Sequence, residues 1–303
     1  MLPIIYGPTG VGKTEILLDI CEEINCQVIS MDSRQIYRYM DIGTAKPTKE
    51  EQKRVKHHMI DIINPDEYYN AYMYRKDVLS LLERLGKENV KVVIAGGTGL
   101  YLDALVRGIF EGVPADENIR KELKKLHEQE PGILRKMLED IDPEAAKKIH
   151  PNDLKRTIRA LEVYMKTGKK ISELQKSAKP SGKYEIIILW RERKELYERI
   201  NKRAEKMVEM GLIEETKRLL EMGYDENLNS MKTIGYKETI EYLKGKYDFP
   251  HYLHVLKRNT RHFARRQIIW SRRYKEAFKI NLTLDKNPRK RLKGKILEAF
   301  TKE

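Results

Sequence analysis

The residues best suited to chemistry lie near the start of the chain, in the run GPTGVGKT at residues 7–14. This run matches G-x-x-x-x-G-K-[ST], follows a short apolar stretch and leads into a helical pattern. Such a loop directs backbone N–H groups, a helix N-terminus and a lysine at an anion, and its last hydroxyl suits Mg²⁺. We therefore predict a diphosphate or triphosphate site. Its predicted residues are Gly7, Pro8, Thr9, Gly10, Val11, Gly12, Lys13 and Thr14, with Thr14 toward the metal.

A second group of polar residues follows the next apolar run, QVIS at residues 27–30. It begins with Asp32 and Ser33. Ligands of open α/β sheets bind at the carboxyl ends of the strands, so we expect Asp32 beside the phosphate ligand, where a carboxylate can act as a base. Asp and Ser are also common caps of helices and turns, so a capping role stays open.

A second glycine-rich turn, GGTGLY at residues 96–101, ends the strand predicted at 90–95. Nucleoside-triphosphate hydrolases usually end such a strand with an Asp that holds Mg²⁺. This chain offers Thr98 instead of an acid. Two glycine-rich turns and Asp32 are thus expected at one edge of the sheet, which favours a substrate channel over a simple nucleotide site.

The 303-residue chain has a net charge of +14, which is unevenly distributed. Residues 251–303 contain 16 Lys and Arg against 4 Asp and Glu, whereas residues 1–250 contain 44 against 42. A basic segment of this kind favours a polyanionic partner, because neutralising phosphates releases counterions. A solvated basic tail that only aids solubility is the alternative.

Two predicted helices carry basic residues at helical spacing. In the long C-terminal helix, Lys257, Arg261 and Arg265 recur every four residues and form a basic stripe with aromatic residues among them. In the middle of the chain, Arg156 and Arg159 lie three apart on one face. We interpret both faces as suited to an RNA backbone, with an ordinary solvated face as the alternative.

The elements that must position these residues alternate along the chain. Apolar runs at 1–6, 27–30, 90–95 and 184–190 are separated by helical patterns, which predicts an α/β fold with a parallel sheet. From Val113 the pattern is helical until the strand at 184. We predict a P-loop-type parallel sheet core flanked by helices, with a helical insertion domain. The predicted segments are 1–112 (first part of the core), 113–183 (insertion) and 184–303 (core completion and basic C-terminal helices).

Several local patterns complete this prediction. A charged helix is expected from about Lys49 to His58, and the chain after residue 190 is expected to be helical. The adjacent pair His57 and His58 does not share a helix face and makes a poor metal site. A cluster of tyrosines is expected to form core and rim, with base stacking as a lesser alternative. These are Tyr68, Tyr69, Tyr72 and Tyr74.

Composition limits the class of protein. The chain has two cysteines, Cys21 and Cys26, which suggests no disulfide framework or metal cluster and fits a reducing compartment. No apolar stretch reaches the roughly 18 residues of a membrane span, and no signal peptide precedes the first predicted strand. We therefore expect a cytoplasmic protein with no membrane partner.

Five motifs, taken in chain order, resemble those of one enzyme family. They are GPTxxGKT at 7–14, DSxQxY at 32–37, GGTGLY at 96–101, HPNDxxRxxRALE at 150–162 and IGYKE at 234–238. The set is similar to tRNA dimethylallyltransferase, also called tRNA isopentenyltransferase, along essentially the whole chain. Gly10-Val11 replaces the Ala-Ser commonly seen in that family's loop, which removes one hydroxyl but keeps the backbone cradle.

The resemblance implies transfer of a dimethylallyl group from dimethylallyl diphosphate, with Mg²⁺, to the exocyclic amine (N6) of the adenine 3′ of the anticodon in tRNA. It implies Asp32 as general base, Thr98 on the same nucleotide, and Lys13 and Arg203 on the diphosphate. The residues implied or predicted to contact the anticodon stem-loop of tRNA are Asp32, Ser33, Arg34, Gln35, Thr98, Arg120, Lys155, Arg156, Thr157, Ile158, Arg159, Lys232, Thr233, Ile234, Gly235, Tyr236, Lys237, Arg261 and Arg265.

Other functions compatible with the phosphate loop stay open at this point. One is a small-molecule kinase and another is a prenyltransferase that acts on free adenine nucleotides. The second leaves the helical insertion and the basic C-terminal segment without a role. A non-enzymatic RNA-binding regulator is a third. Because one chain carries every motif, we expect it to act as a monomer.

Overall fold

The computed structural model describes residues 1–110 and 113–302. The chain forms two compact units, Met1–Leu102 with Gly182–Glu303, and Asp103–Ser181. The second unit begins earlier than the predicted insertion because its entering and leaving segments pair. The Ser181 N–H and hydroxyl both donate to the Leu105 carbonyl, at 3.3 and 2.8 Å. Residues 111–112, which end the predicted first segment, lie outside the described residues.

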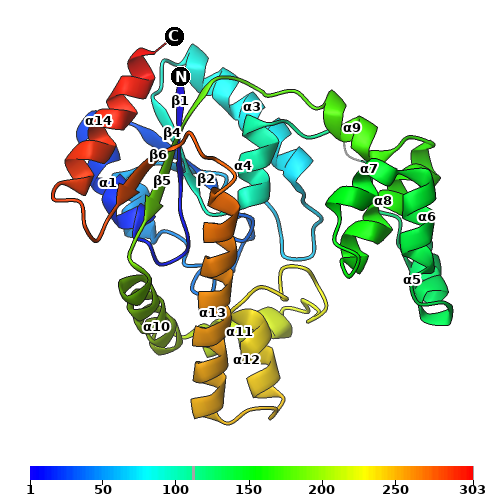
Figure 1. Ribbon diagram of the computed structural model, residues 1–303. Coiled ribbons are helices and arrows are strands. Elements are labelled where there is room, and N and C mark those ends of the chain that lie inside the picture. The colour runs from blue at the N-terminus through cyan, green and yellow to red at the C-terminus, as the bar shows by residue number, and fades with distance from the viewer. Residues whose placement is uncertain (111–112, 303) are drawn as a thin grey trace. The chain divides into compact units, whose positions relative to one another are not determined.

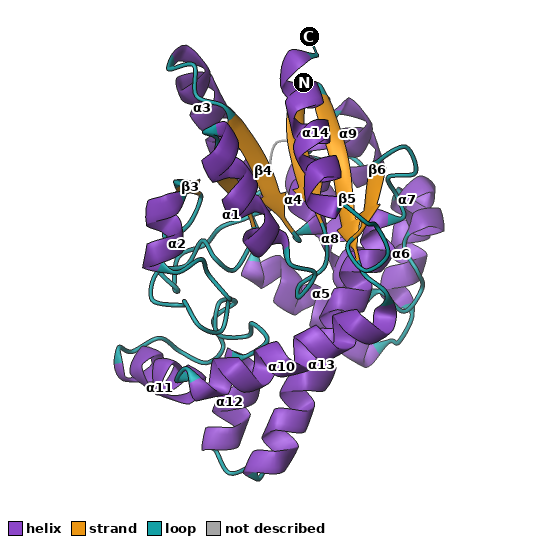
Figure 2. Ribbon diagram, turned by 90° about the vertical axis from the view of Figure 1, so that its left-hand side faces the viewer, coloured by secondary structure: helices purple, strands orange, loops and turns teal. Residues whose placement is uncertain are grey.

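A six-stranded sheet forms the centre of the first unit, with the order β3-β2-β4-β1-β5-β6. Every described pair of neighbouring strands is parallel, so the predicted fold class is confirmed (Figures 1 and 2). The strands are β1 (Leu2–Tyr6), β2 (Gln27–Met31), β3 (His57–His58), β4 (Val92–Gly96), β5 (Tyr184–Trp190) and β6 (Phe278–Asn281).

The central strands are buried on both faces, as their apolar composition predicts for a parallel sheet. Ile4 and Ile5 of β1 point to opposite faces, and both are fully buried. Burying one such side chain stabilises the fold by about 1.5–3 kcal/mol. β1 lies between β4 and β5, so its carboxyl end opens into the phosphate loop near the middle of the sheet.

Helices surround this sheet in the first unit. They are α1 (Lys13–Ile24), α2 (Lys49–Arg54), α3 (Ala71–Lys87), α4 (Gly99–Val106, shared with the second unit), α10 (Arg193–Glu209), α11 (Leu212–Glu221), α12 (Tyr236–Leu243), α13 (Phe249–Ser271) and α14 (Pro288–Thr301). Helices α10 to α13 gather beyond the carboxyl ends of the strands (Figure 2). α14 instead ends beside the start of β1, where the Met1 amine donates to the Ala299 carbonyl at 2.9 Å.

Two local predictions are wrong. The helix expected from Lys49 to His58 ends at Arg54, because the backbone of Val55 is extended. The Lys56 carbonyl accepts a hydrogen bond from the Val28 N–H of β2 at 2.9 Å and not from a helical partner. The two histidines then form an edge strand of the sheet. The chain after residue 190 is also not all helical. β6 pairs with β5, and at four residues it is too short to show an alternating pattern.

The tyrosine cluster divides as predicted between core and rim. Tyr74 is fully buried and stacks on Tyr101 at 3.9 Å between ring centroids, whereas Tyr68 is exposed. In the part of the chain that the structure describes, no helix is both long and apolar enough to span a bilayer.

The second unit is helical and has its own core. Its helices are α5 (Glu117–Gln129), α6 (Ile133–Ile141), α7 (Pro143–Lys148), α8 (Leu154–Thr167) and α9 (Ile171–Ser177). Leu138, Leu161 and Val163 are fully buried in this core. Asp116 caps the first of these helices, since its side chain accepts hydrogen bonds from the N–H groups of Asn118 and Ile119.

Candidate active site

A cavity of about 870 Å³ lies in the first unit, among the loops that follow the strands. This volume is near the upper end of the roughly 300–1,000 Å³ that small-molecule sites occupy. Its wall includes the phosphate loop, the turns after β2 and β4, α10, α13 and the segment before α12. The predicted sites on these elements therefore meet in one space, which holds Lys13, Asp32, Thr98 and Arg203.

The phosphate loop is closed by its own lysine. Lys13 Nζ donates to the carbonyls of Gly7 and Pro8, at 2.7 and 2.9 Å. The pKa of Lys13 is lowered to about 7. Burial is the main cause, the Asp32 carboxylate opposes it, and the nearby charge of Arg203 adds to the lowering. An anion that entered the loop would favour the charged form of the amine.

Three side chains that the sequence reasoning missed hold the phosphate loop from outside. Arg199 Nε donates to the Gly10 carbonyl at 3.1 Å, and Arg191 Nε donates to the Val11 carbonyl at 2.8 Å. Gln267 of α13 accepts from the Thr9 N–H at 2.8 Å. Of these three, Arg199 alone could have been found from the sequence, because it lies one helical turn before Arg203. The other partners lie about 180 and 260 residues away.

Arg203 reaches the same loop from α10. Its Nη1 lies 3.5 Å from the Thr9 hydroxyl oxygen. Burial lowers the pKa of Arg203, as does the charge of Arg199, and Asp32 acts in the opposite direction. Asp32 therefore influences both cations, Lys13 and Arg203. The cavity combines a carboxylate with two positive groups beside the loop.

Asp32 serves as a turn cap and also faces the cavity. Its Oδ1 accepts from the N–H groups of Arg34 and Gln35, at 2.8 and 3.4 Å. No hydrogen bond to Oδ2 occurs among the described residues, so this oxygen is available to a ligand in the cavity. Thr98 holds the same turn, since its Oγ1 accepts from the Ser33 N–H at 2.9 Å. The capping and base interpretations of Asp32 are thus compatible.

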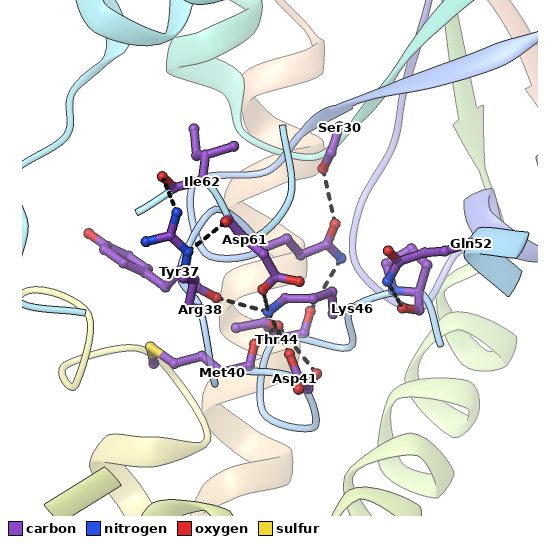
Figure 3. A network of polar contacts seen from close by, with 12 residues as sticks. Ser30, Tyr37, Arg38, Met40, Asp41, Thr44, Lys46, Gln52, Asp61 and Ile62 are labelled. Carbon is purple, nitrogen blue, oxygen red and sulfur yellow. Dashed lines mark hydrogen bonds and ion pairs between the residues drawn. The ribbon is translucent and has the colours of Figure 1, made fainter. Parts of the chain in front are cut away.

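The segment that follows Asp32 is fixed by buried polar contacts (Figure 3). Gln35 accepts from the Ser30 hydroxyl at 3.0 Å and donates to the Ala45 carbonyl at 3.1 Å, so its amide is engaged inside the segment. The Lys46 side chain is only 2% exposed. Its amine lies 2.5 Å from both Asp41 Oδ1 and Asp61 Oδ1.

Comparison with known proteins gives the family. A family model described as IPP transferase matches residues 35–274. The tRNA dimethylallyltransferase of Thermotoga maritima is 68% identical over 302 residues, which cover 99% of each chain. The tRNA isopentenylpyrophosphate transferase of Bacillus halodurans has a solved structure that is 37% identical, with a TM-score of 0.70 over 98% of this chain and 97% of its own.

The chain belongs to the IPP transferase family. It is therefore a transferase enzyme. A solved eukaryotic dimethylallyltransferase acting on tRNA is also similar, with 27% identity and a TM-score of 0.78 over 96% of this chain and 77% of its own.

Only part of the segment 232–237 lines the cavity. Thr233, Ile234 and Gly235 line the cavity, and Lys232 and Lys237 are exposed. Tyr236 is fully buried, and its hydroxyl donates to Glu215 Oε1 at 2.6 Å. Its side chain thus supports the segment and does not face a ligand.

Glu215 ties the segment after Asp32 to α11 and α12. Its carboxylate accepts from the N–H groups of Asp41, Ile42 and Gly43, at 2.9–3.1 Å. With the Tyr236 hydroxyl, this buried carboxylate has four donor groups. Because these hydrogen bonds satisfy the buried carboxylate, we infer that Glu215 has a structural role and connects distant parts of the chain.

The basic stripe predicted on α13 is only partly open to a ligand. Lys257 pairs with Glu205 at 2.5 Å, and Arg261 donates to Asn201 Oδ1 at 2.6 Å, so both contact α10. Arg265 is exposed. The prediction of one continuous stripe is therefore wrong, because α13 packs against α10 along part of this face.

The predicted tRNA contacts of the second unit also differ in exposure. Lys155 and Arg156 are exposed. Thr157 and Ile158 are buried, so their side chains stabilise the helical core and do not face a ligand. Arg159, the other member of the predicted basic face, is only 29% exposed.

Two arginines of the second unit converge on one buried carboxylate. Arg120 Nε lies 2.9 Å from Glu162 Oε1, and Arg159 Nη1 lies 2.5 Å from Glu162 Oε2. The Asp116 N–H donates to the same carboxylate at 2.7 Å. Arg120 and Arg159 thus stabilise the unit, and each keeps about 30% of its side chain exposed.

The donor chemistry of the loop fits Mg²⁺. The described residues contain no cluster of three or more His, Cys, Asp or Glu that could form a protein cage for a metal. Mg²⁺ is commonly held by one or two protein oxygens, substrate phosphates and water. Thr14 lines the cavity beside Lys13, and its hydroxyl can supply one such oxygen.

Proposed function

We propose that this enzyme transfers a dimethylallyl group from dimethylallyl diphosphate to the exocyclic amine (N6) of the adenine 3′ of the anticodon in tRNA, releasing diphosphate. The observation that carries the proposal is the meeting of a phosphate loop, two cations and a carboxylate in one cavity. The relative from Thermotoga maritima, named tRNA dimethylallyltransferase, supports it over almost the full chain.

The phosphate loop and its cations stabilise the leaving group. Breaking the allylic C–O bond leaves negative charge on the diphosphate, and Lys13, Arg203 and the loop N–H groups lie where that charge develops. Donors that are held around the bound diphosphate need little rearrangement during the chemical step. Arg191, Arg199 and Gln267 provide that fixation by holding the loop from outside.

Thr14 would hold Mg²⁺ together with oxygens of the diphosphate. When bound, the metal supplies further positive charge to the leaving group. Lys13 and Arg203 act beside it as fixed positive groups, and Lys13 exchanges its bonds to Gly7 and Pro8 for bonds to the diphosphate.

Asp32 is the general base. The adenine N6 forms a bond to the allylic carbon as the C–O bond breaks, and one N6 proton passes to Asp32. Oδ1 stays bound to the turn, so Oδ2 accepts the proton. General-base catalysis of this kind contributes about 10²–10⁴-fold. Thr98 orients the turn and contacts the same nucleotide.

The adenine must leave its stacked position in the anticodon loop to enter the cavity. Flipping a base costs a few kcal/mol, which contacts elsewhere on the RNA offset. Exposed basic groups that can make those contacts include Arg156, Arg265 and Lys237. We also propose that one chain suffices for the reaction and that it acts in the cytoplasm, where unmodified tRNA is found.

The proposal is tested by incubating the protein with dimethylallyl diphosphate, Mg²⁺ and unmodified tRNA, and then analysing the nucleosides. We expect N6-dimethylallyladenosine and one diphosphate per modified tRNA. A parallel reaction replaces tRNA with AMP. Prenylated AMP at a comparable rate would indicate a free-nucleotide prenyltransferase, and ATP turnover without RNA would indicate a kinase. Absence of prenylated adenosine from the tRNA reaction would reject the proposal.

A further inference from the structure

Gln267 joins the two glycine-rich turns with a single side chain. It lies on α13 and is only 5% exposed. Its Oε1 accepts from the Thr9 N–H at 2.8 Å, and its Nε2 donates to the Gly97 carbonyl at 2.9 Å. The carboxamide thus connects the phosphate loop after β1 to the turn after β4 through both of its polar ends.

The turn after β4 is shaped to receive α13. A Cβ atom on Gly97 would lie 2.2 Å from Gln267 Nε2, and one on Gly99 would lie 2.4 Å from the Trp270 ring. Gln267 and Trp270 are three residues apart and share a helix face. The turn therefore touches α13 at two points, and a larger residue at either glycine would separate them.

The contact continues from this turn to Asp32. The Thr98 N–H donates to the Met31 carbonyl at 3.2 Å, and Thr98 Oγ1 accepts from the Ser33 N–H at 2.9 Å. Both partners flank Asp32 in the chain. A path of hydrogen bonds thus runs from Thr9 through Gln267 to the Thr98 turn and the residues on either side of Asp32.

We propose that Gln267 is a positioning residue that couples occupancy of the phosphate loop to the placement of Thr98 and Asp32. This inference rests on the proposed function for the roles of Asp32 and the loop. Diphosphate draws Lys13 away from Gly7 and Pro8, and the resulting shift of the loop at Thr9 is carried by Gln267 to Gly97. The base is then in position only when the diphosphate is in place.

A glutamine is the side chain that this position requires. It accepts from Thr9 and donates to Gly97 at the same time. A glutamate keeps the acceptor for Thr9 but loses the donor for Gly97, and a methionine keeps the length but loses both. Gln267→Glu and Gln267→Met therefore remove one connection and two connections, respectively.

Trp270 provides a reporter for the coupling that does not depend on catalysis. The chain has two tryptophans, and Trp190 is 39% exposed. Trp190→Phe leaves Trp270, which packs on the turn that Gln267 holds. In this background, inorganic diphosphate with Mg²⁺ is titrated while tryptophan emission is recorded, and its binding is measured separately by calorimetry. His254→Gln, an exposed change on α13, is the matched control.

We expect diphosphate to change the emission in the Trp190→Phe and control proteins. Adding Gln267→Met should remove most of this change while diphosphate affinity stays within about threefold. In the reaction with tRNA, both Gln267 variants should lower kcat by about 10- to 100-fold, with a smaller effect on the KM for dimethylallyl diphosphate. A role in packing alone would lower the melting temperature and leave kcat per folded enzyme unchanged.

An emission change of normal size in Gln267→Met, or an unchanged kcat per folded enzyme, would overturn the inference. If Gln267→Met does not fold, Gln267→Glu is tested in the same way. Failure of the wild-type enzyme to prenylate tRNA would reject the proposed function. The diphosphate titration still tests the coupling in that case, because it needs neither tRNA nor turnover.

Discussion

Asp32, Lys13 and Arg203 share one cavity, and their charges set its chemistry. The two cations are partly desolvated, which lowers the pKa of each, and the carboxylate opposes this effect. A bound diphosphate would compensate the positive charges of Lys13 and Arg203. In the proposed reaction, Asp32 accepts the proton of the amine through Oδ2, while Oδ1 stays bound to the turn.

Asp32→Asn isolates the base. The amide oxygen still accepts from the Arg34 N–H, so we expect the turn to survive and tRNA affinity to change little. Turnover should fall by about 10²–10⁴-fold, because the amide cannot accept the proton. Single-turnover kinetics with preloaded tRNA measures this step. Near-normal turnover would remove Asp32 from the mechanism.

Diphosphate binding should take up a proton above neutral pH. The Lys13 pKa is about 7 in the unliganded protein, so the amine is mainly neutral at pH 8 and mainly charged at pH 6. A bound diphosphate favours the charged form, so affinity should fall as pH rises from 7 to 9. Calorimetry at pH 8 in buffers of different ionisation enthalpy measures this uptake.

Lys13→Met is the control for that experiment. It removes the amine, and any proton that it still takes up on binding comes from the diphosphate or from other groups. The difference in proton uptake between the two proteins at pH 8 should approach one and should vanish at pH 6. Equal uptake by both proteins would show that the lysine is already charged before binding.

At the scale of elements, the segment between β2 and α2 depends on buried polar groups for its shape. Lys46 lies between Asp41 and Asp61 and also donates to the Tyr37 carbonyl at 2.8 Å. Glu215 fixes the same segment from α11. An irregular segment that forms a cavity wall needs such contacts, because it lacks the hydrogen bonds of regular structure.

Lys46→Met should lower the free energy of unfolding by about 1–3 kcal/mol, because the Tyr37 carbonyl and Asp41 lose their partner and Asp61 keeps only the exposed Lys49. Lys53→Met is the matched control, since Lys53 is exposed on α2 and lies outside this network. We expect a change within about 0.5 kcal/mol for the control. Urea denaturation measures both. Equal effects would mean that the Lys46 network contributes no net stability.

The dependence of tRNA affinity on salt concentration tests which basic residues of α13 contact RNA. Arg261 contacts Asn201 of α10, whereas Arg265 is exposed. Arg265→Gln should reduce the slope of log affinity for tRNA against log salt by about one unit. Arg261→Gln should mainly reduce stability, with a smaller effect on the slope. A larger slope change for Arg261 would reverse this assignment.

The sequence predicted those parts of the site that directly follow a recognisable strand. The phosphate loop, Asp32 and Thr98 each end a strand, so the parallel sheet brings them together. Gln267 could not be predicted, because its partners Thr9 and Gly97 lie 258 and 170 residues away. Helical spacing identified Arg261 but could not show that α10 covers it. The basic residues of α14 could likewise be interpreted as RNA contacts or as a solvated face. In the structure, Lys293 of α14 pairs with Glu23 of α1.

At the scale of the whole molecule, the helical unit is an insertion with its own core. Its buried residues, such as Leu138 and Leu161, form a cluster separate from that of the sheet. The ends of the insertion lie close together, since a Cβ on Gly108 would be 2.3 Å from the Lys179 carbonyl oxygen. The chain could therefore be rejoined without the unit.

Replacing residues 108–179 with a short Gly-Ser linker should leave a folded first unit that binds diphosphate within about threefold of normal. Its affinity for tRNA should fall by about tenfold or more, since each lost phosphate contact removes counterion release. Calorimetry with diphosphate and filter binding with tRNA measure the two effects. Unchanged tRNA affinity would mean that Lys155 and Arg156 are not RNA contacts.

The position of β1 between β4 and β5 affects how the protein is made on the ribosome. β4 is available early, but the other neighbour of β1 appears only after the whole helical unit has been synthesised. At a synthesis rate of about 5–20 residues per second, this edge of β1 stays unpaired for several seconds. The helical unit, with its local contacts, can fold during this wait. We therefore expect nascent chains whose β4 has left the ribosome, but whose β5 has not, to expose an edge of β1 that chaperones can bind.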